Sequence, residues 1–294
     1  MRVLVLGAGG QLGRDLLPVL VAGGHEVRGT TRSEVEVTDP SQVQAALAKG
    51  NFDRVVNCAA YTKVDQAESE AALAFAINRD GAGLVARLCA EAGVPLCHIS
   101  TDFVFSQAVA GEPRPWRTTD VPQPKGVYAE SKWAGDRACQ EAGGELFLVR
   151  TSWLYGNSGP NFPLAIVGAA ARGRELKVVS DQVGCPTWTR DLSLGVAWLL
   201  TTTHFGTHHL CGQGSTTWCE FAMAVLEGVG LSAKVSPVST AEWGAPAPRP
   251  RYSVLDSSEF LSLGGPGLSD WRTALHAYLD SERDGAVGAA LSGA

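Results

Sequence analysis

Tyr128 and Lys132 are four residues apart in a stretch with helical periodicity, so both side chains should lie on one face of a helix. A free phenol has a pKa of roughly 10, too high to exchange protons readily at neutral pH. A neighbouring ammonium group favours the phenolate and is expected to lower that pKa. The spacing therefore predicts a catalytic pair in which Tyr128 transfers a proton and Lys132 assists it.

Polar residues end an apolar run over 95–101, which is expected to be a buried strand. Ligands of open parallel sheets bind at the carboxyl ends of the strands, where Ser100, Thr101 and Asp102 would lie. A hydroxyl group there could orient a carbonyl substrate and Tyr128. We predict that Thr101 is catalytic and that Asp102 contacts substrate, although such residues also cap turns.

A glycine-rich turn joins the apolar residues 2–6 to a helical pattern over 11–22. Its glycines Gly7, Gly10 and Gly13 give the spacing G-x-x-G-x-x-G, which differs from the shorter G-x-G-x-x-G because position 12 is Leu. Such a turn lets the backbone approach a pyrophosphate and aims a helix N-terminus at it. The pattern predicts a dinucleotide-binding site.

The residues after the second expected strand bear on the choice of dinucleotide. An acid there would bind a ribose 2′-hydroxyl and repel a 2′-phosphate, but this chain has Thr30, Thr31 and Arg32. Arg32 could pair with a 2′-phosphate. We therefore expect NADPH to be preferred, with NADH as the alternative.

Strands and helices alternate through the first half of the chain. The strands are expected at 2–6, 25–30, 53–58, 95–101 and 146–152, and the helices at 11–22, 40–48, 71–92 and 126–142. This alternation predicts an α/β fold, a Rossmann-like doubly wound parallel sheet covered on both faces.

After residue 155 the pattern loosens, with helices near 161–173, 189–201 and 217–228 and a proline-rich stretch over 237–252. We expect residues 1–155 to form the NAD(P)-binding domain, joined by later strands near 177–210. Residues 156–294 should form mainly a smaller C-terminal substrate-binding lobe. The small residues of 285–294 are expected to form a flexible tail.

Composition excludes several classes of protein. A net charge of −6 over 294 residues argues against a nucleic-acid binder. The sequence has no apolar run long enough to span a membrane, and its N-terminus enters a strand at once rather than a signal peptide. The seven cysteines are scattered without a C-x-x-C pair, which argues against disulfides and structural zinc. We expect a cytoplasmic protein.

Beyond these motifs, the chain resembles the dTDP-4-dehydrorhamnose reductase family of extended short-chain dehydrogenases/reductases over roughly residues 1–280. The glycine turn and the Y-x-x-x-K pair are shared by the whole superfamily. The more specific matches are the stretches 57–68, 100–105 and 150–156, Asp181-Gln182 with Pro186-Thr187, Thr216-Thr217-Trp218, and Arg249-Pro250 with Ser253 and Leu255-Asp256.

The resemblance implies NAD(P)H-dependent reduction of dTDP-4-dehydro-6-deoxy-L-mannose to dTDP-L-rhamnose. It places cofactor contacts on Gly10, Gln11, Leu12, Thr30, Glu36, Val37, Ala60, Tyr61, Thr62, Tyr128 and Lys132. It places the sugar against Thr101, Asp102 and the aromatic face of Trp153, and Arg249 could hold the pyrophosphate. Asn78 should hold neighbouring backbone rather than substrate.

The resemblance also bears on metal binding and assembly. Some members bind magnesium through acidic side chains at a dimer interface. This chain has no convincing acidic cluster near 187–191, where Arg190 intervenes, so we expect no metal. A homodimer remains open.

Three alternative functions on the same scaffold stay open. A dehydratase or epimerase would need further acid and base groups, and dehydratase relatives carry Glu after Thr-Asp where this chain has Phe103. A reductase for another 4-keto deoxysugar is the second. The third is a non-catalytic NADP-binding regulatory subunit, against which the intact Thr101, Tyr128 and Lys132 argue.

Overall fold

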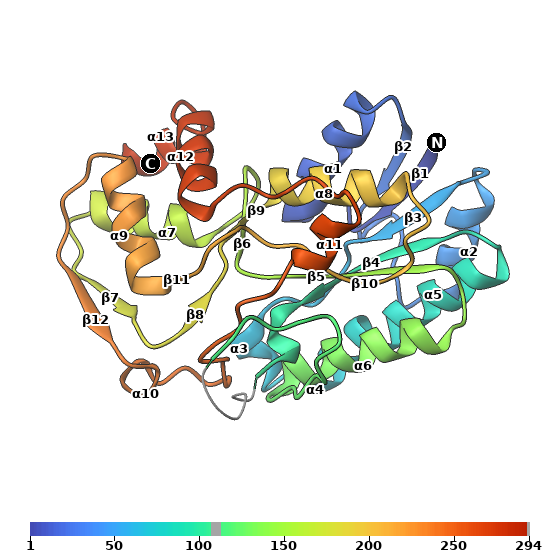
Figure 1. Cartoon of the computed structure of the whole chain (residues 1–294), viewed down its shortest axis with the longest axis horizontal. Helices are drawn as coiled ribbons and strands as arrows, with labels where there is room; N and C mark the ends of the chain where they lie inside the picture. Colours follow the sequence, from blue (N-terminus) through green and yellow to red (C-terminus); the bar gives the residue numbers. More distant parts are fainter. Residues whose placement is uncertain (107–112, 293–294) are drawn as a thin grey trace.

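A computed structural model describes residues 1–106 and 113–292 and is organised around a six-stranded sheet (Figure 1). Its strands are β1 (Arg2–Leu6), β2 (Glu26–Thr30), β3 (Arg54–Asn57), β4 (Leu96–Thr101), β5 (Leu146–Thr151) and β10 (Gly206–His209). They lie in the order β10-β5-β4-β3-β1-β2, and all neighbouring pairs are parallel.

Helices cover both faces of this sheet, because alternate side chains of each buried strand point to opposite faces. Val3 and Val5 pack with α1 (Gln11–Ala22) and α8 (Thr189–Leu200). Leu4 and Leu6 pack on the other face with α2 (Pro40–Ala48) and α5 (Ala82–Glu91). Helix α6 (Val127–Glu141) packs beside α5 in that second layer (Figure 1). The predicted α/β, Rossmann-like fold is confirmed.

The strand order creates a crevice beside β1. Strands β2 and β3 lie on opposite sides of β1, so the connections that follow β1 and β3 leave the sheet in different directions. Open α/β sheets bind their ligands at this kind of switch point, outside the carboxyl ends of the strands. The glycine turn follows β1 and residues 58–60 follow β3, so both lie at this crevice.

The helix predicted over 71–92 is confirmed as helical from Ala71 to Glu91, with a π-helical turn in its middle. It consists of α4 (Ala71–Phe75), a π-helical turn η1 (Ala76–Gly81) and α5. Gly135 of α6 approaches this turn so closely that an added Cβ would lie 1.9 Å from the carbonyl oxygen of Asn78. The Asn78 side chain bonds both the N–H and the C=O of Tyr61, at 2.8 and 3.0 Å, as predicted.

A smaller lobe packs around its own core at one end of the molecule (Figure 1). It contains α7 (Phe162–Ala171), α9 (Trp218–Gly228), α12 (Trp271–Ser281) and α13 (Ala286–Leu291), with α10 (Thr240–Trp243) at its edge. Among the described residues, two further short helices lie outside this core, α3 (Val64–Ala67) and α11 (Ser258–Ser262).

The strands near 177–210 divide between the two parts of the molecule. Only β10 joins the central sheet within the part of the chain that the structure describes. Strand β7 (Leu176–Val179) pairs with β12 (Val235–Val238), β8 (Val183–Gly184) with β11 (Thr216–Thr217), and β9 (Thr187–Trp188) with β6 (Leu154–Tyr155). The expectation for this range is therefore corrected to β10 alone, because β7 to β9 find partners outside the sheet.

The tail predicted over 285–294 is also corrected. Residues Ala286–Leu291 form α13, whose Val287 is buried in the core of the smaller lobe and whose Ala290 packs against it. Small side chains permit this close packing although they give no visible hydrophobic pattern. Residues 293 and 294 lie outside the described residues. Over the described ranges, no helix has both the length and the hydropathy to cross a membrane.

Candidate active site

Tyr128 and Lys132 lie in the first turns of α6, as the spacing predicted. Gly126 directly precedes the helix with φ of 91°, and an added Cβ there would lie 2.7 Å from Pro248. The half-buried Tyr128 ring meets Phe103 edge-on, with centroids 5.4 Å apart. The ammonium of the buried Lys132 donates to the carbonyl oxygen of Ile99 at 2.8 Å.

The electrostatics of this pair differ from the expectation that Lys132 lowers the pKa of Tyr128. Desolvation raises the pKa of Tyr128 to about 12, a hydrogen bond with Thr101 opposes this, and the carboxylates of Asp102 and Asp136 add to it. The expectation fails because partial desolvation of the phenol outweighs the hydrogen bond with Thr101, while Lys132 donates to the Ile99 carbonyl instead. Tyr128 is consequently a protonated phenol at neutral pH, the form that can donate a proton.

Thr101 and Asp102 lie where β4 ends, next to Tyr128. The Thr101 hydroxyl donates to Asp102 Oδ1 at 3.2 Å and accepts from the N–H of Phe103, also at 3.2 Å. Burial raises the pKa of Asp102 to about 7, although hydrogen bonds from Ser253 and Thr101 oppose this shift. The structure thus brings Thr101, Asp102 and Tyr128 together, as the sequence predicted.

A cavity of about 300 Å³ occupies the crevice beside β1. It is lined by six predicted cofactor residues, namely Gly7, Gly10, Arg32, Glu36, Val37 and Ala60. It is also lined by Gly9, Val35, Cys58, Ala59 and Ile77, which the sequence reasoning did not name. Cys58 and Ala59 lie within the family-specific stretch 57–68, so that stretch held the signal for them.

The other predicted cofactor residues are not among those that line this cavity. Leu12, Gly13 and Thr30 are buried, and Thr62 is exposed. Tyr61 donates its hydroxyl to Glu70 at 2.7 Å. Among the described residues, Gln11 Nε2 and Thr30 Oγ1 are buried without a hydrogen-bond partner.

The glycine turn fits a dinucleotide. Gly7 has φ of 73°, and an added Cβ would lie 2.6 Å from the backbone nitrogen of Ala59. At Gly13 an added Cβ would lie 2.6 Å from Ala8 Cα. Only glycine therefore permits this turn and the approach of α1 to it, which is the geometry that presents a helix N-terminus to a pyrophosphate.

Arg32 and Glu36 form an ion pair at the rim of this cavity, with Arg32 Nε 2.8 Å from Glu36 Oε2. The Arg32 side chain is 73% exposed, whereas that of Glu36 is 27% exposed. The pair leaves the terminal guanidinium nitrogens of Arg32 outside this contact, where they can meet an anion.

Trp153 has an unusual backbone and a stacked ring. Its φ of 46° is the only positive value for a non-glycine residue over the described ranges. Its indole stacks on that of Trp218, with centroids 3.6 Å apart and planes 6° from parallel. An added Cβ at Gly184 would lie 2.4 Å from the same ring. Trp218 thus covers one face of the Trp153 ring, and the contact of an aromatic face of Trp153 with a sugar stays a prediction.

Arg249 is engaged by a residue that the sequence reasoning did not pair with it. Its guanidinium bonds both carboxylate oxygens of Asp65, at 2.9 and 2.8 Å. Arg249 also lies at the rim of a second, largely apolar cavity of about 510 Å³ in the smaller lobe. Its other walls include Phe162, Trp218 and Trp243.

Metal ligation has no candidate within residues 1–106 and 113–292. No group of three or more His, Cys, Asp or Glu side chains there is arranged to hold an ion.

The fold and the site together define a Rossmann-like scaffold of the NAD(P)-binding kind, with a Y-x-x-x-K pair at the carboxyl edge of its sheet. The chain belongs to the family described as the RmlD substrate binding domain, whose model matches residues 1–283.

Named relatives cover nearly the whole chain. The dTDP-4-dehydrorhamnose reductase of Streptomyces griseus is 41% identical over 93% of this chain and 91% of its own length. The probable dTDP-4,6-dihydroxy-2-methyloxan-3-one 4-ketoreductase of Streptomyces antibioticus is 38% identical over 94% of this chain and 93% of its own length. The crystal structure of dTDP-4-dehydrorhamnose reductase from Bacillus anthracis, in complex with NADP, superposes with a TM-score of 0.91 at 36% identity over 95% of this chain and 99% of that one.

Proposed function

We propose that this protein is an NAD(P)H-dependent oxidoreductase that reduces the 4-keto group of dTDP-4-dehydro-6-deoxy-L-mannose to give dTDP-L-rhamnose. NADPH is the preferred cofactor and NADH the alternative. The single observation that carries the proposal is the placement of Tyr128, with Lys132 one turn along the same helix, beside Thr101 and Phe103 at the carboxyl edge of the sheet. The family membership and the named relatives supply the substrate class.

The cofactor would lie along the glycine turn, with Gly7, Gly10, Ala60, Glu36 and Val37 around it. When bound, its nicotinamide supplies the hydride. Lys132, whose ammonium donates to the Ile99 carbonyl, would hold the nicotinamide ribose, as the family resemblance implies. Arg32 would meet the 2′-phosphate of NADPH.

Tyr128, assisted by Thr101, would carry out the proton transfer. The Tyr128 hydroxyl donates its proton to the 4-keto oxygen as carbon 4 receives the hydride, so the product carries a new hydroxyl group and Tyr128 is left as a phenolate. Thr101 would orient the carbonyl and stabilise the phenolate by turning its single hydroxyl hydrogen from Asp102 to the oxygen of Tyr128. The high pKa of Tyr128 makes its proton return readily from solvent.

The sugar would lie between Thr101–Asp102 and Trp153, with the nucleotide directed toward Arg249. Arg249 would bind the nucleotide rather than the reacting carbon, so its binding energy would position the sugar. Because Asp65 already holds Arg249, a phosphate would share or displace that carboxylate.

A second candidate is the reduction of a different 4-keto deoxysugar, which the Streptomyces antibioticus relative favours. Phe103 packs against Tyr128 at the position after Thr101-Asp102, so the added acid of a dehydratase has no counterpart there.

Location and assembly belong to the same proposal. All seven cysteines are free thiols and six of them are buried, which suits a reducing cytoplasm. We retain a homodimer as the assembly to test by light scattering.

The experiment that tests the function compares the wild type with Tyr128→Phe. The wild type should oxidise NADPH when given the 4-keto sugar, followed by absorbance of the reduced nicotinamide. The variant should lose roughly two to four orders of magnitude in kcat. Its affinity for NADPH should be unchanged, and near wild-type turnover would remove the assignment of Tyr128.

A further inference from the structure

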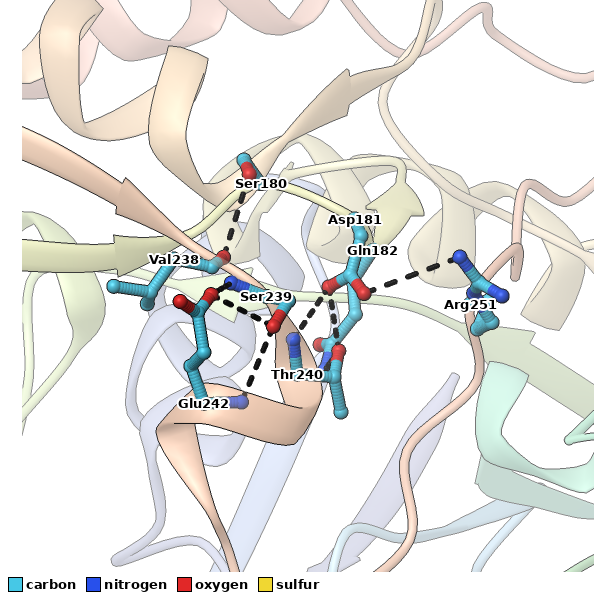
Figure 2. A network of polar contacts seen from close by, with 8 residues as sticks. All are labelled: Ser180, Asp181, Gln182, Val238, Ser239, Thr240, Glu242 and Arg251. Atoms are coloured by element: carbon cyan, nitrogen blue, oxygen red, sulfur yellow. Dashed lines mark hydrogen bonds and ion pairs between the residues drawn. The ribbon is translucent and has the colours of Figure 1, made fainter.

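Asp181 and Gln182 belong to a matched stretch whose role the proposed reaction leaves unassigned, and they lie in a dense polar network at the edge of the smaller lobe (Figure 2). Asp181 Oδ1 accepts from both the N–H and the hydroxyl of Thr240, at 2.8 and 2.6 Å. Gln182 Nε2 donates to the same hydroxyl oxygen at 3.0 Å. Thr240, the first residue of α10, is therefore fixed by three hydrogen bonds from two residues.

The donor and the acceptor of each hydrogen bond between Trp218 and Asp181 are fixed by the groups at the two ends of the series. The indole N–H of Trp218 can only donate, and it gives its proton to Gln182 Oε1 at 3.2 Å. The amide orientation of Gln182 is thereby set, so its nitrogen must donate to Thr240. The Thr240 hydroxyl then donates to Asp181, which can only accept. Each hydrogen bond in the series from Trp218 to Asp181 therefore has only one possible donor.

Burial contributes little to holding helix α10 in place, so its position depends on this hydrogen-bond network. None of its four residues is buried. A capping box between Ser239 and Glu242 closes the helix, and Ser180 bonds the carbonyl of Val238 just before it (Figure 2). These bonds tie the segment to residues 180–182, which directly follow β7.

The same segment carries Trp243, whose side chain is unusually open for a tryptophan. It is 55% exposed, yet it lines the apolar cavity together with Phe162, Trp218 and Gln182. Arg249 lies on the rim of that cavity and supplies a cation. Aromatic walls beside a cation suit a planar ring that is joined to a phosphate, since aromatic faces stack on bases and guanidinium groups bind phosphates.

We propose that Trp243 is a specificity-determining residue for the nucleotide end of the substrate, and that Asp181, Gln182 and Thr240 form a latch that positions it over the base. This inference rests on the proposed function for the identity of the ligand. Trp243 supplies one aromatic wall for the base, and Gln182 ties that wall to Trp218. Trp218 also stacks on Trp153. The latch therefore connects Trp243, proposed to contact the base, to Trp153, proposed to contact the sugar.

The test measures the affinity of the intact protein for free dTDP and the steady-state constants for the nucleotide sugar. Trp243→Ala should raise the Kd for dTDP and the KM for the sugar by about tenfold, the range expected for losing one stacked base contact. Trp243→Phe should lose less than about threefold, because an aromatic face remains. The kcat at saturation and the Kd for NADPH should stay within a factor of about two, since Trp243 touches neither reacting group.

The latch is tested by a matched pair at Thr240. Thr240→Val keeps the branched shape without the hydroxyl and should raise the Kd for dTDP by about three- to tenfold. Thr240→Ser keeps the hydroxyl and should restore wild-type affinity. Inorganic pyrophosphate is the control ligand, because its inhibition constant should respond to Arg249→Ala and not to Trp243→Ala.

The outcomes separate this inference from the proposed function. If the wild type reduces the sugar while Trp243→Ala and Thr240→Val leave the Kd for dTDP within a factor of two, the inference is overturned and the function stands. If the wild type does not reduce the sugar but Trp243→Ala weakens dTDP binding, the function is overturned and the inference stands. Equal losses in Thr240→Ser and Thr240→Val would overturn the latch.

Discussion

The indole rings of Trp153 and Trp218 lie 3.6 Å apart and within 6° of parallel, although the two residues come from different parts of the molecule. Trp153 follows β5 of the central sheet, whereas Trp218 begins α9 of the smaller lobe. A positive φ at Trp153 turns its ring to meet Trp218, and such a backbone costs of order 1–3 kcal/mol unless the surroundings enforce it. The stack therefore joins the edge of the central sheet to the smaller lobe.

Replacing Trp153 should damage both binding and turnover. Trp153→Ala removes the proposed contact to the sugar and the stack on Trp218, and aromatic pairs contribute about 0.5–1.5 kcal/mol beyond burial. We expect KM to rise and kcat to fall, with kcat/KM reduced by about tenfold or more. Steady-state kinetics with a thermal-unfolding control checks this. Unchanged kinetics in a folded variant would remove Trp153 from the sugar site.

Arg32 should determine the choice between the two dinucleotides. Arg32→Ala removes the cation proposed for the 2′-phosphate and leaves the Glu36 carboxylate unpaired in the cavity. A charge-assisted contact contributes about 1.5–3 kcal/mol, so the preference for NADPH over NADH should fall at least about tenfold.

Glu36→Gln provides the matched control for Arg32. It removes the competing carboxylate and should strengthen NADPH relative to NADH. The ratio of kcat/KM for the two cofactors measures both effects. Equal losses for the two cofactors in Arg32→Ala would show that another residue contacts the phosphate.

Arg249 should affect the nucleotide sugar and leave the cofactor unaffected. Arg249→Ala is expected to raise the KM for the nucleotide sugar about tenfold, with the Kd for NADPH unchanged. Asp65→Asn keeps the shape of the partner but removes its charge, so it should free the guanidinium and lower that KM. If both variants raised KM equally, the Arg249–Asp65 pair would be a structural contact alone.

Asp102 should make the stability of the protein depend on pH. Its folded pKa of about 7 is above its ordinary value of 3.8, so the folded state binds the extra proton between these values. The stabilisation from protonated Asp102 is therefore full at low pH and is lost as the pH rises through 7.

Asp102→Asn has no such dependence. Its free energy of unfolding relative to the wild type should rise between pH 5 and pH 8, by at most about 2–3 kcal/mol. Urea denaturation at the two pH values measures this difference. A constant difference would mean that Asp102 is ionised at both.

The regular elements could be predicted because their signals are local. The bounds of β1, α1 and α2 match the prediction, since periodic apolar residues and the turns that flank them lie within each segment. The glycine turn and the Tyr128–Lys132 pair are equally local. Their placement at one edge of the sheet then follows from the general rule for parallel strands.

The contacts that the sequence did not predict join distant residues. Gly135 of α6 closely approaches Asn78 in the π-helical turn, and Arg249 bonds Asp65, which is 184 residues away. The raised pKa of Tyr128 reflects burial by surrounding elements, which spacing along a helix does not encode. The helix α13 forms through packing on the smaller lobe and has little amphipathic pattern of its own.

The measurement that tests the central claim most directly is isotope transfer to the product. The purified protein is incubated with dTDP-4-dehydro-6-deoxy-L-mannose and with NADPH that carries deuterium at both positions of nicotinamide carbon 4, and the product is analysed by NMR. We predict dTDP-L-rhamnose with deuterium on carbon 4 of the sugar, formed by the wild type and not at a comparable rate by Tyr128→Phe. Recovery of the unchanged 4-keto sugar, or a product without deuterium at carbon 4, would contradict the account.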